Sequence, residues 1–259
     1  MVRIINLERV RLPLHTHPHP DPQMTDGAEA PARTARGEQT RALIVSTAIE
    51  LFRERGYEET TMRAVAERAG VALGSAYYYF RSKDELVQTF YARTHEEHLA
   101  ASAEVLRREP TLRGRLAGVM RTKLETIEPY HQFAGVLFRS AADPASPLNP
   151  FSEPSRPVRE QAVELFAEVV RGATDRRVPP DLRAELPHLL WLYHMGIILF
   201  WIHDATPGRR RTRRMVDLSV DLIVRAVAVT SSPLMRPLRT SLLRLLKEVE
   251  AAGAPEPEG

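Results

Sequence analysis

The sequence predicts an all-α protein in which a small N-terminal helical domain is followed by a larger helical one. From Glu38 onward, apolar residues recur with the spacing of amphipathic helices. The alternation of β-branched and polar residues that is typical of strands is not sustained anywhere in the chain. With 259 residues, 43% of them hydrophobic, the chain can bury a substantial core.

The first two predicted helices each end at a glycine. Gly56 ends the first and Gly70 the second, because glycine suits the left-handed conformation that follows many helix ends. Thr60 and Thr61 offer hydroxyl caps for the start of the second helix. The apolar faces consist of Ile44, Ala48, Leu51 and Phe52 in the first helix and Met62, Val65, Ala66 and Ala69 in the second.

A third helix is predicted from about Gly74 to Phe80, only a few residues after the second. Two short helices on a tight turn form a helix-turn-helix. Ala76 and Phe80 have the spacing to face inward. Ser82 and Glu85 have capping-box spacing, so a fourth helix begins directly after Ser82 and continues to about residue 107.

The larger domain, over residues 83–252, should contain further helices after a break at Pro110. They are expected at Thr111–Ile127, Tyr130–Ala141, Pro157–Gly172, Leu182–Asp204, Arg209–Thr230 and Leu234–Ala252. The stretch Asp143–Pro157 holds five prolines and is predicted to be a long loop of the kind that is often functional or mobile. Residues 253–259 are predicted to be a disordered tail.

Residues 1–37 are predicted to be a disordered extension, because proline, histidine, threonine, alanine and glycine dominate most of this stretch without a sustained apolar period. Met24 lies inside it and is an alternative start of translation to Met1. His15, His17 and His19 alternate in a way that could contact a metal, but they lie among prolines in a tail that is predicted to be disordered. We therefore expect no metal and no cofactor.

The composition narrows the possible functions. The absence of cysteine excludes disulfides, thiolate metal sites and cysteine nucleophiles, and it leaves the redox compartment open. A net charge of +3 favours a nucleic-acid partner only weakly, and acidic residues outnumber basic ones between Glu38 and Phe90. No secretory signal is apparent, and the apolar stretch Leu189–Ile202 is shorter than the roughly 18 residues of a membrane span. We expect a cytoplasmic protein without membrane contact.

Tyr77, Tyr78 and Tyr79 are the sharpest functional signal. Successive helical residues lie about 100° apart, so three consecutive tyrosines cannot share one buried stripe. A tyrosine ring packs on thymine methyls or sugars, and its hydroxyl donates to phosphate oxygens. Gly74 would let the backbone approach DNA closely. The alternative is a helix packed by aromatic residues without any ligand.

Thr60-Thr61, Val65-Ala66, the run from Ala69 to Phe80, Ser82-Lys83 and Leu86 together resemble the N-terminal signature of the TetR family, over roughly Glu38–Tyr91. The resemblance implies a DNA-binding domain over residues 38–82 whose third helix reads the major groove. It implies DNA contacts from Thr61, Arg63, Leu73, Gly74, Ser75, Tyr77, Tyr78, Tyr79 and Lys83. Arg63 matches a position that can reach a base, and arginine binds guanine bidentately.

Three positions depart from the family pattern. Ala72 stands where many members have a capping serine, Leu73 stands where a polar base-reading residue is common, and Ala76 is smaller than the usual leucine. The first two departures leave the base preference open. The third implies that Tyr77 or Phe80 adjusts the packing of the helix.

The helices near residues 187–204 and 209–230 predict a homodimer. The first is apolar around its whole axis and the second on more than one face, so one protomer alone cannot cover them. A four-helix bundle with a two-fold mate would do so, and the family dimerises in this way. The arginine cluster at 209–214 is either a second nucleic-acid patch or a solvated helix end, and we leave it unassigned.

The expected function is a ligand-responsive repressor that binds a near-palindromic double-stranded operator as a dimer and is released by a small-molecule effector. Aromatic and hydrogen-bonding groups that could line the effector cavity are Tyr130, Phe133, Phe138, Trp191 and His194. His194 could equally be a satisfied core histidine. Two alternatives are an effector-independent DNA-binding protein and an enzyme, but we find no phosphate loop, nucleophile elbow or metal-binding pattern to support catalysis.

Overall fold

The computed structural model describes residues 30–175, 178–237, 239–241 and 244. These residues form α-helices and short 3₁₀ helices, and no strand occurs among them, as predicted. The α-helices are α1 (Ala30–Arg55), α2 (Met62–Ala69), α3 (Leu73–Tyr79), α4 (Lys83–Arg108), α5 (Leu112–Ile127), α6 (His131–Ala141), α7 (Arg156–Arg171), α8 (Pro180–His203) and α9 (Arg210–Thr230). The 3₁₀ helices are η1 (Glu128–Tyr130), η2 (Pro207–Arg209) and η3 (Pro233–Met235).

The N-terminal boundary differs from the sequence prediction. Helix α1 begins at Ala30, so residues 30–37 are helical rather than disordered. The physical reason is local, because this stretch is rich in alanine and arginine, which favour helices, and Pro31 lies in the first turn, where its missing N–H is tolerated. The predictions for residues 1–29, including the three histidines and Met24, and for the tail 253–259 lie outside the described residues. So does most of the last predicted helix.

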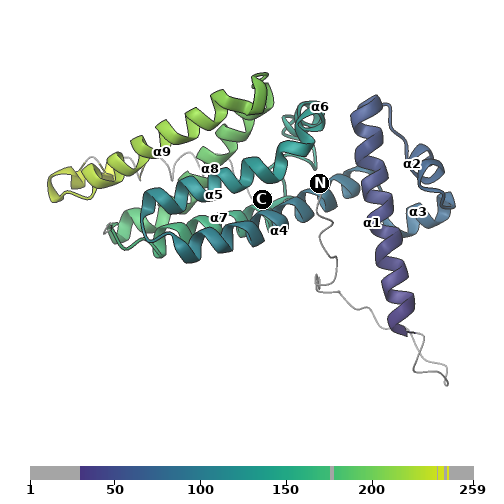
Figure 1. Cartoon of the computed structure of the whole chain (residues 1–259), viewed down its shortest axis with the longest axis horizontal. Helices are drawn as coiled ribbons and strands as arrows, with labels where there is room; N and C mark the ends of the chain where they lie inside the picture. Colours follow the sequence, from purple (N-terminus) through teal and green to yellow (C-terminus); the bar gives the residue numbers. More distant parts are fainter. Residues whose placement is uncertain (1–29, 176–177, 238, 242–243, 245–259) are drawn as a thin grey trace, which may run out of the picture. The chain divides into compact units, whose positions relative to one another are not determined.

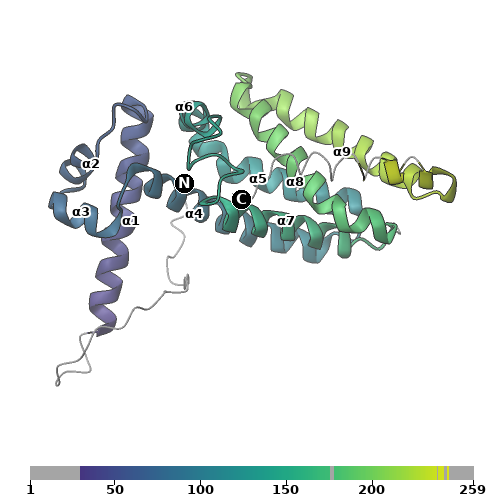
Figure 2. The ribbon, with the colours of Figure 1, turned by 180° about the vertical axis from the view of Figure 1, so that it is seen from behind.

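Two hydrophobic cores organise the described chain. The first joins α1, α2, α3 and the start of α4 to Phe133 and Leu137 of α6. The second is formed mainly by α5, α7, α8 and α9. Helix α4 contributes Phe90 to the first core and then runs beside α5 and α7 (Figures 1 and 2). The two cores are therefore linked by one continuous helix.

Helix α8 is apolar on nearly all sides. An 18-residue window within its 24 residues has a mean hydropathy of 1.2, which by length and composition is enough to cross a membrane, although a helix covered by protein satisfies the same criteria. Here it packs against α7 and α9 and buries Trp191 and Trp201. Helix α9 is fixed against α5 by the ion pairs Arg113–Asp221 (2.6 Å) and Arg121–Asp217 (2.5 Å).

The proline-rich segment between α6 and α7 is anchored on both sides. Its backbone forms successive turns, and Gln88 of α4 donates from Nε2 to the carbonyl oxygen of Pro147 (2.6 Å) and to Oγ of Ser155 (3.1 Å). Arg159 of α7 donates from Nη1 to the carbonyl oxygen of Pro150 at 2.7 Å. The segment thereby forms a wall beside α4 and α7.

Candidate functional site

Local capping places α2 and α3 as a tight pair. Thr61 is the N-cap of α2, and its Oγ1 accepts from the Ala64 N–H at 3.2 Å. Thr60 is buried and donates from Oγ1 to the carbonyl oxygen of Gly56 at 2.7 Å. Gly70 ends α2 at φ 68°, a left-handed conformation that favours glycine. The predicted helix-turn-helix is thus built from the residues that signalled it.

Two buried side chains hold α3 in place. Ala76 and Phe80 are fully buried in the core shared with α1 and α2. The Arg41 guanidinium of α1 lies 4.9 Å from the centre of the Phe80 ring. Ala72 at the N-cap of α3 has an extended backbone and provides no side-chain cap, as its residue type implied. The inward set expected for this helix is therefore observed.

The opposite side of α3 presents the tyrosines. Tyr77 is 50% exposed and Tyr78 83% exposed, and Gly74 and Ser75 are exposed beside them. Tyr79 is half-buried, and its ring meets that of Tyr78 edge to face at 5.2 Å. Together these residues form an outward surface with aromatic rings and hydroxyls. Such a surface can pack on sugars or methyls and donate to phosphates.

Leu73 and Lys83 make contacts within the protein that the sequence did not predict. Leu73 is half-buried and packs against the first core. The Lys83 ammonium donates to the carbonyl oxygens of Tyr57 (2.8 Å) and Glu58 (3.3 Å), and lies 4.3 Å from the centre of the Tyr57 ring. Lys83 thus ties the α1–α2 turn to the start of α4. Thr61 and Arg63, in contrast, are exposed.

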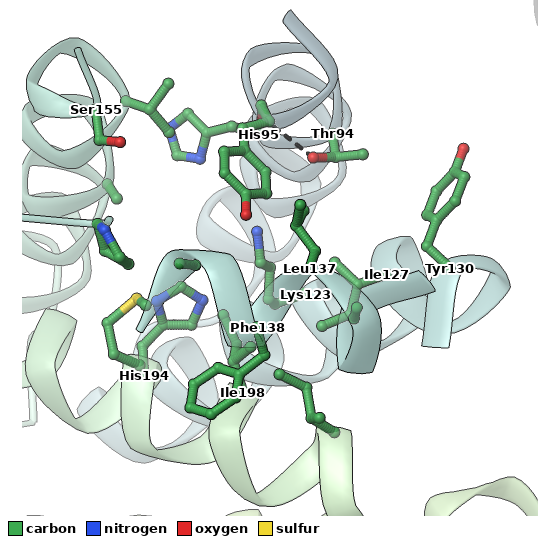
Figure 3. A pocket seen from close by; sticks show the side chains of 18 of the residues that line it. Thr94, His95, Lys123, Ile127, Tyr130, Leu137, Phe138, Ser155, His194 and Ile198 are labelled. Atoms are coloured by element: carbon green, nitrogen blue, oxygen red, sulfur yellow. Dashed lines mark hydrogen bonds between the residues drawn. The ribbon is translucent and has the colours of Figure 1, made fainter. Parts of the chain in front are cut away.

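All five residues proposed for an effector cavity line one cavity of about 240 Å³. Figure 3 labels three of them, Tyr130, Phe138 and His194. The cavity is lined by residues of helices α4, α5, α6, α7 and α8 and of the proline-rich segment. The five residues are Tyr130, Phe133, Phe138, Trp191 and His194. The sequence could not fix the directions of these side chains, and the packing of five helices brings them together.

One wall of the cavity is also part of the first core. Phe133 lines the cavity, and its ring stacks on Phe52 of α1 at 5.8 Å and nearly parallel, at 8°. Phe90 meets Phe133 edge to face at 5.4 Å and Tyr130 at 4.8 Å. This aromatic cluster of Phe52, Phe90, Tyr130 and Phe133 connects the cavity directly to the helix that supports α2 and α3.

The residues predicted from the sequence did not include Lys123, one of the two cations that line this cavity. Lys123 is only 9% exposed, and burial lowers the pKa of its ammonium group to about 8. A signal was present, because Lys123 continues the apolar stripe of α5 that contains Leu116 and Met120. A charged lysine at such a core position destabilises the folded state unless its charge is paired.

Three histidines surround Lys123. This histidine cluster consists of His95 and His98 on α4 and His194 on α8, all buried. Burial and the nearby Lys123 charge lower the pKa of His95 to about 4 and that of His98 to about 3, and hold the pKa of His194 well below its usual value. The imidazoles are therefore neutral at physiological pH. Within the described ranges, no group of three His, Cys, Asp or Glu could hold a metal ion.

The sequence left open whether His194 is a core histidine whose ring nitrogens are hydrogen-bonded, and the structure does not show it as one. Both of its ring nitrogens are buried and lack a hydrogen-bond partner among the described residues. A neutral imidazole carries one donor and one acceptor, so both capacities are unused. His98, by comparison, places Nε2 at 3.0 Å from the carbonyl oxygen of Val119.

Comparison with known proteins agrees with this arrangement. Residues 44–89 match the N-terminal pattern described as bacterial regulatory proteins, tetR family, and residues 115–242 match the tetracyclin repressor-like C-terminal domain. The regulator TtgR of Pseudomonas putida is 42% identical over 69 residues, which are 26% of this chain and 33% of TtgR. The match therefore spans about a third of that relative.

Two further comparisons each cover more than half of the chain. The repressor KstR2 of Mycolicibacterium smegmatis is 25% identical over 158 residues, which are 61% of this chain and 76% of KstR2. The crystal structure of the transcriptional regulator FadR of Bacillus subtilis, in complex with stearoyl-CoA, superposes with a TM-score of 0.57 at 16% identity and covers 69% of this chain and 96% of FadR. On the two matched domain patterns and the shared fold, the chain belongs to the TetR family of bacterial regulatory proteins.

Proposed function

We propose that the protein is a homodimeric, ligand-responsive transcriptional repressor that binds a near-palindromic DNA operator in the cytoplasm. The observation that carries the proposal is the outward tyrosine surface of α3, held by buried Ala76 and Phe80 on a helix-turn-helix that matches a DNA-binding family. In this fold class the second helix of the motif enters the major groove. Exposed Tyr77 and Tyr78 then meet the DNA, and exposed Arg63 is the candidate for a bidentate contact with guanine.

Dimerisation is supported by two apolar stripes that are exposed in the described part of the chain. On α9, Met215, Leu218, Leu222 and Val229 follow one another at intervals of three, four and seven residues and are exposed, while four other valines of the helix are buried against the core: Val216, Val220, Val224 and Val227. On α8, exposed apolar side chains are Leu192, Leu199 and Phe200. The opposite face of α9 is buried in the second core, so this stripe points away from that core. A second copy of α8 and α9 would cover both stripes in a four-helix bundle.

The cavity favours an effector-responsive protein over a DNA-binding protein without an effector. The cavity has a largely apolar lining and a few convergent polar groups, which is the common character of small-molecule sites. Its aromatic wall contacts α1, the helix that supports the DNA-binding surface, through the stack of Phe133 on Phe52. A ligand that displaces Phe133 would disturb its stack on Phe52 and hence the support of α2 and α3.

Selection of binding sites from random double-stranded DNA tests the proposal. We expect enrichment of a near-palindrome whose half-sites are separated by about 34 Å or a multiple of it. Tyr78→Ala should lower the affinity for the enriched site. Tyr193→Phe should leave that affinity unchanged, because it removes only a hydroxyl that hydrogen-bonds to Ser219 at the second core. Failure to enrich any sequence would overturn the proposed function.

A further inference from the structure

The charged side chains that line the cavity are all cationic. Lys123 and Arg159 contribute two cations, and none of the residues that line the cavity is an aspartate or a glutamate. Arg159 already donates to the carbonyl oxygens of Pro150 and Ser152. Within the described part of the chain, Lys123 makes no hydrogen bond and no ion pair. A buried charge of this kind lacks the partner that buried charges normally have.

The unused polar groups converge on one space. Figure 3 shows the Lys123 amine reaching from α5 toward the space that His95 of α4 and His194 of α8 also face. His194 has two unpartnered ring nitrogens, and Nε2 of His95 has none of its hydrogen-bonding capacity met by a described residue. A neutral imidazole N–H beside an ammonium group provides two donors for one acceptor group. The remaining wall is mostly aromatic and aliphatic.

We propose that the effector is an amphipathic organic carboxylate, with its carboxylate paired to Lys123 and hydrogen-bonded by His194 and its apolar body lying against the aromatic wall. This inference rests on the proposed function and names the chemical class of its ligand. A carboxylate has two oxygens, so it can accept from the ammonium group and from an imidazole at once. A neutral ligand would leave the Lys123 charge without compensation, and a cationic ligand would be repelled by it.

The pairing also predicts proton uptake. Burial lowers the pKa of Lys123 to about 8, so at about pH 9 much of the free protein carries a neutral amine. A bound carboxylate favours the charged form and raises this pKa, so binding should take up a fraction of a proton per site. The neighbouring groups do not interfere, because the pKa values of the histidine cluster lie far below this pH and burial raises that of Tyr91.

Three probes with one chain and different head groups test the inference: decanoate, decan-1-ol and decylamine. Isothermal titration of the full-length protein at about pH 7 should show decanoate binding about thirtyfold more tightly than decanol, and decylamine binding most weakly. Lys123→Met should abolish the preference for decanoate. Arg139→Met, which removes an exposed cation beside cavity-lining Phe138, should preserve it.

Titrations at about pH 9 in two buffers with different ionisation enthalpies measure the proton uptake. We expect uptake with decanoate in the wild type and none with decanol or with Lys123→Met. Equal affinities for decanoate and decanol, an unchanged preference in Lys123→Met, or no binding of any probe would overturn the inference. Those results leave the proposed function intact as long as the wild type and Lys123→Met bind the selected DNA equally, and loss of DNA recognition would instead be a failure of the proposed function.

Discussion

Replacing Lys123 by methionine should stabilise the ligand-free protein. The substitution keeps the length of the side chain but removes a charge that is 9% exposed and has no counter-ion among the described residues. Burial lowers the pKa of the ammonium group from 10.5 to about 8. At 1.36 kcal/mol for each pH unit of that difference, the buried charge costs the folded state about 3 kcal/mol at neutral pH.

This cost can be checked by thermal unfolding. For a chain of this size, about 3 kcal/mol corresponds to a rise in Tm of about 6 to 12 °C for Lys123→Met. The difference should depend on pH in a defined window. Below about pH 8 both the folded and the unfolded lysine are protonated, so the folded state bears the full cost.

Between about pH 8 and about pH 10.5 the folded lysine loses its proton while the unfolded one retains it, and the cost disappears. The advantage of Lys123→Met should therefore shrink as the pH rises through this window. The histidine cluster stays neutral there, so it adds no pH dependence of its own. A Tm of Lys123→Met at or below that of the wild type at neutral pH would refute the view that Lys123 is held at the expense of stability.

Three further predictions concern acid stability, the dimer and DNA recognition. The histidine cluster should destabilise the fold as the pH falls below 6.5, because the unfolded state takes up protons that the buried rings do not. The loss of unfolding free energy should be about 2 kcal/mol per histidine at about pH 5. Unchanged urea midpoints between pH 7 and 5 would contradict this. Leu222→Glu should convert the dimer to a monomer in light scattering, whereas Leu234→Glu, at an exposed site outside the α9 stripe, should not. Arg63→Ala should relax the preference for one base of the operator without changing Tm. Lys83→Ala should lower Tm, because two hydrogen bonds from the ammonium group to backbone carbonyl oxygens are lost. Equal effects of the two variants on base preference would be inconsistent with these roles.

The sequence predicted the helix-turn-helix because its determinants are local. Gly70 ends α2 with a left-handed backbone, and Ser82 caps α4 by accepting from the Glu85 N–H at 3.2 Å. The separation of buried Ala76 and Phe80 from exposed Tyr78 follows from helical periodicity alone. Each of these interactions joins residues that are close in the chain.

The features that the sequence did not predict depend on contacts between distant segments. The carbonyl oxygens that bind Lys83 lie 25 and 26 residues away, so nothing near Lys83 signals its structural role. The polar centre of the cavity requires α4, α5 and α8 to pack together before Lys123 meets His194. The five cavity residues were chosen by residue type, and their convergence was beyond what periodicity can determine.

We propose that one molecule both reads DNA through α3 and responds to a ligand in the cavity. The most direct test is the affinity for the selected operator, measured by fluorescence anisotropy at one fixed salt concentration, with and without saturating decanoate. We expect decanoate to weaken DNA binding by the wild type, by about tenfold or more, and to leave DNA binding by Lys123→Met unchanged. Binding of decanoate in the cavity with no change in DNA affinity would contradict it.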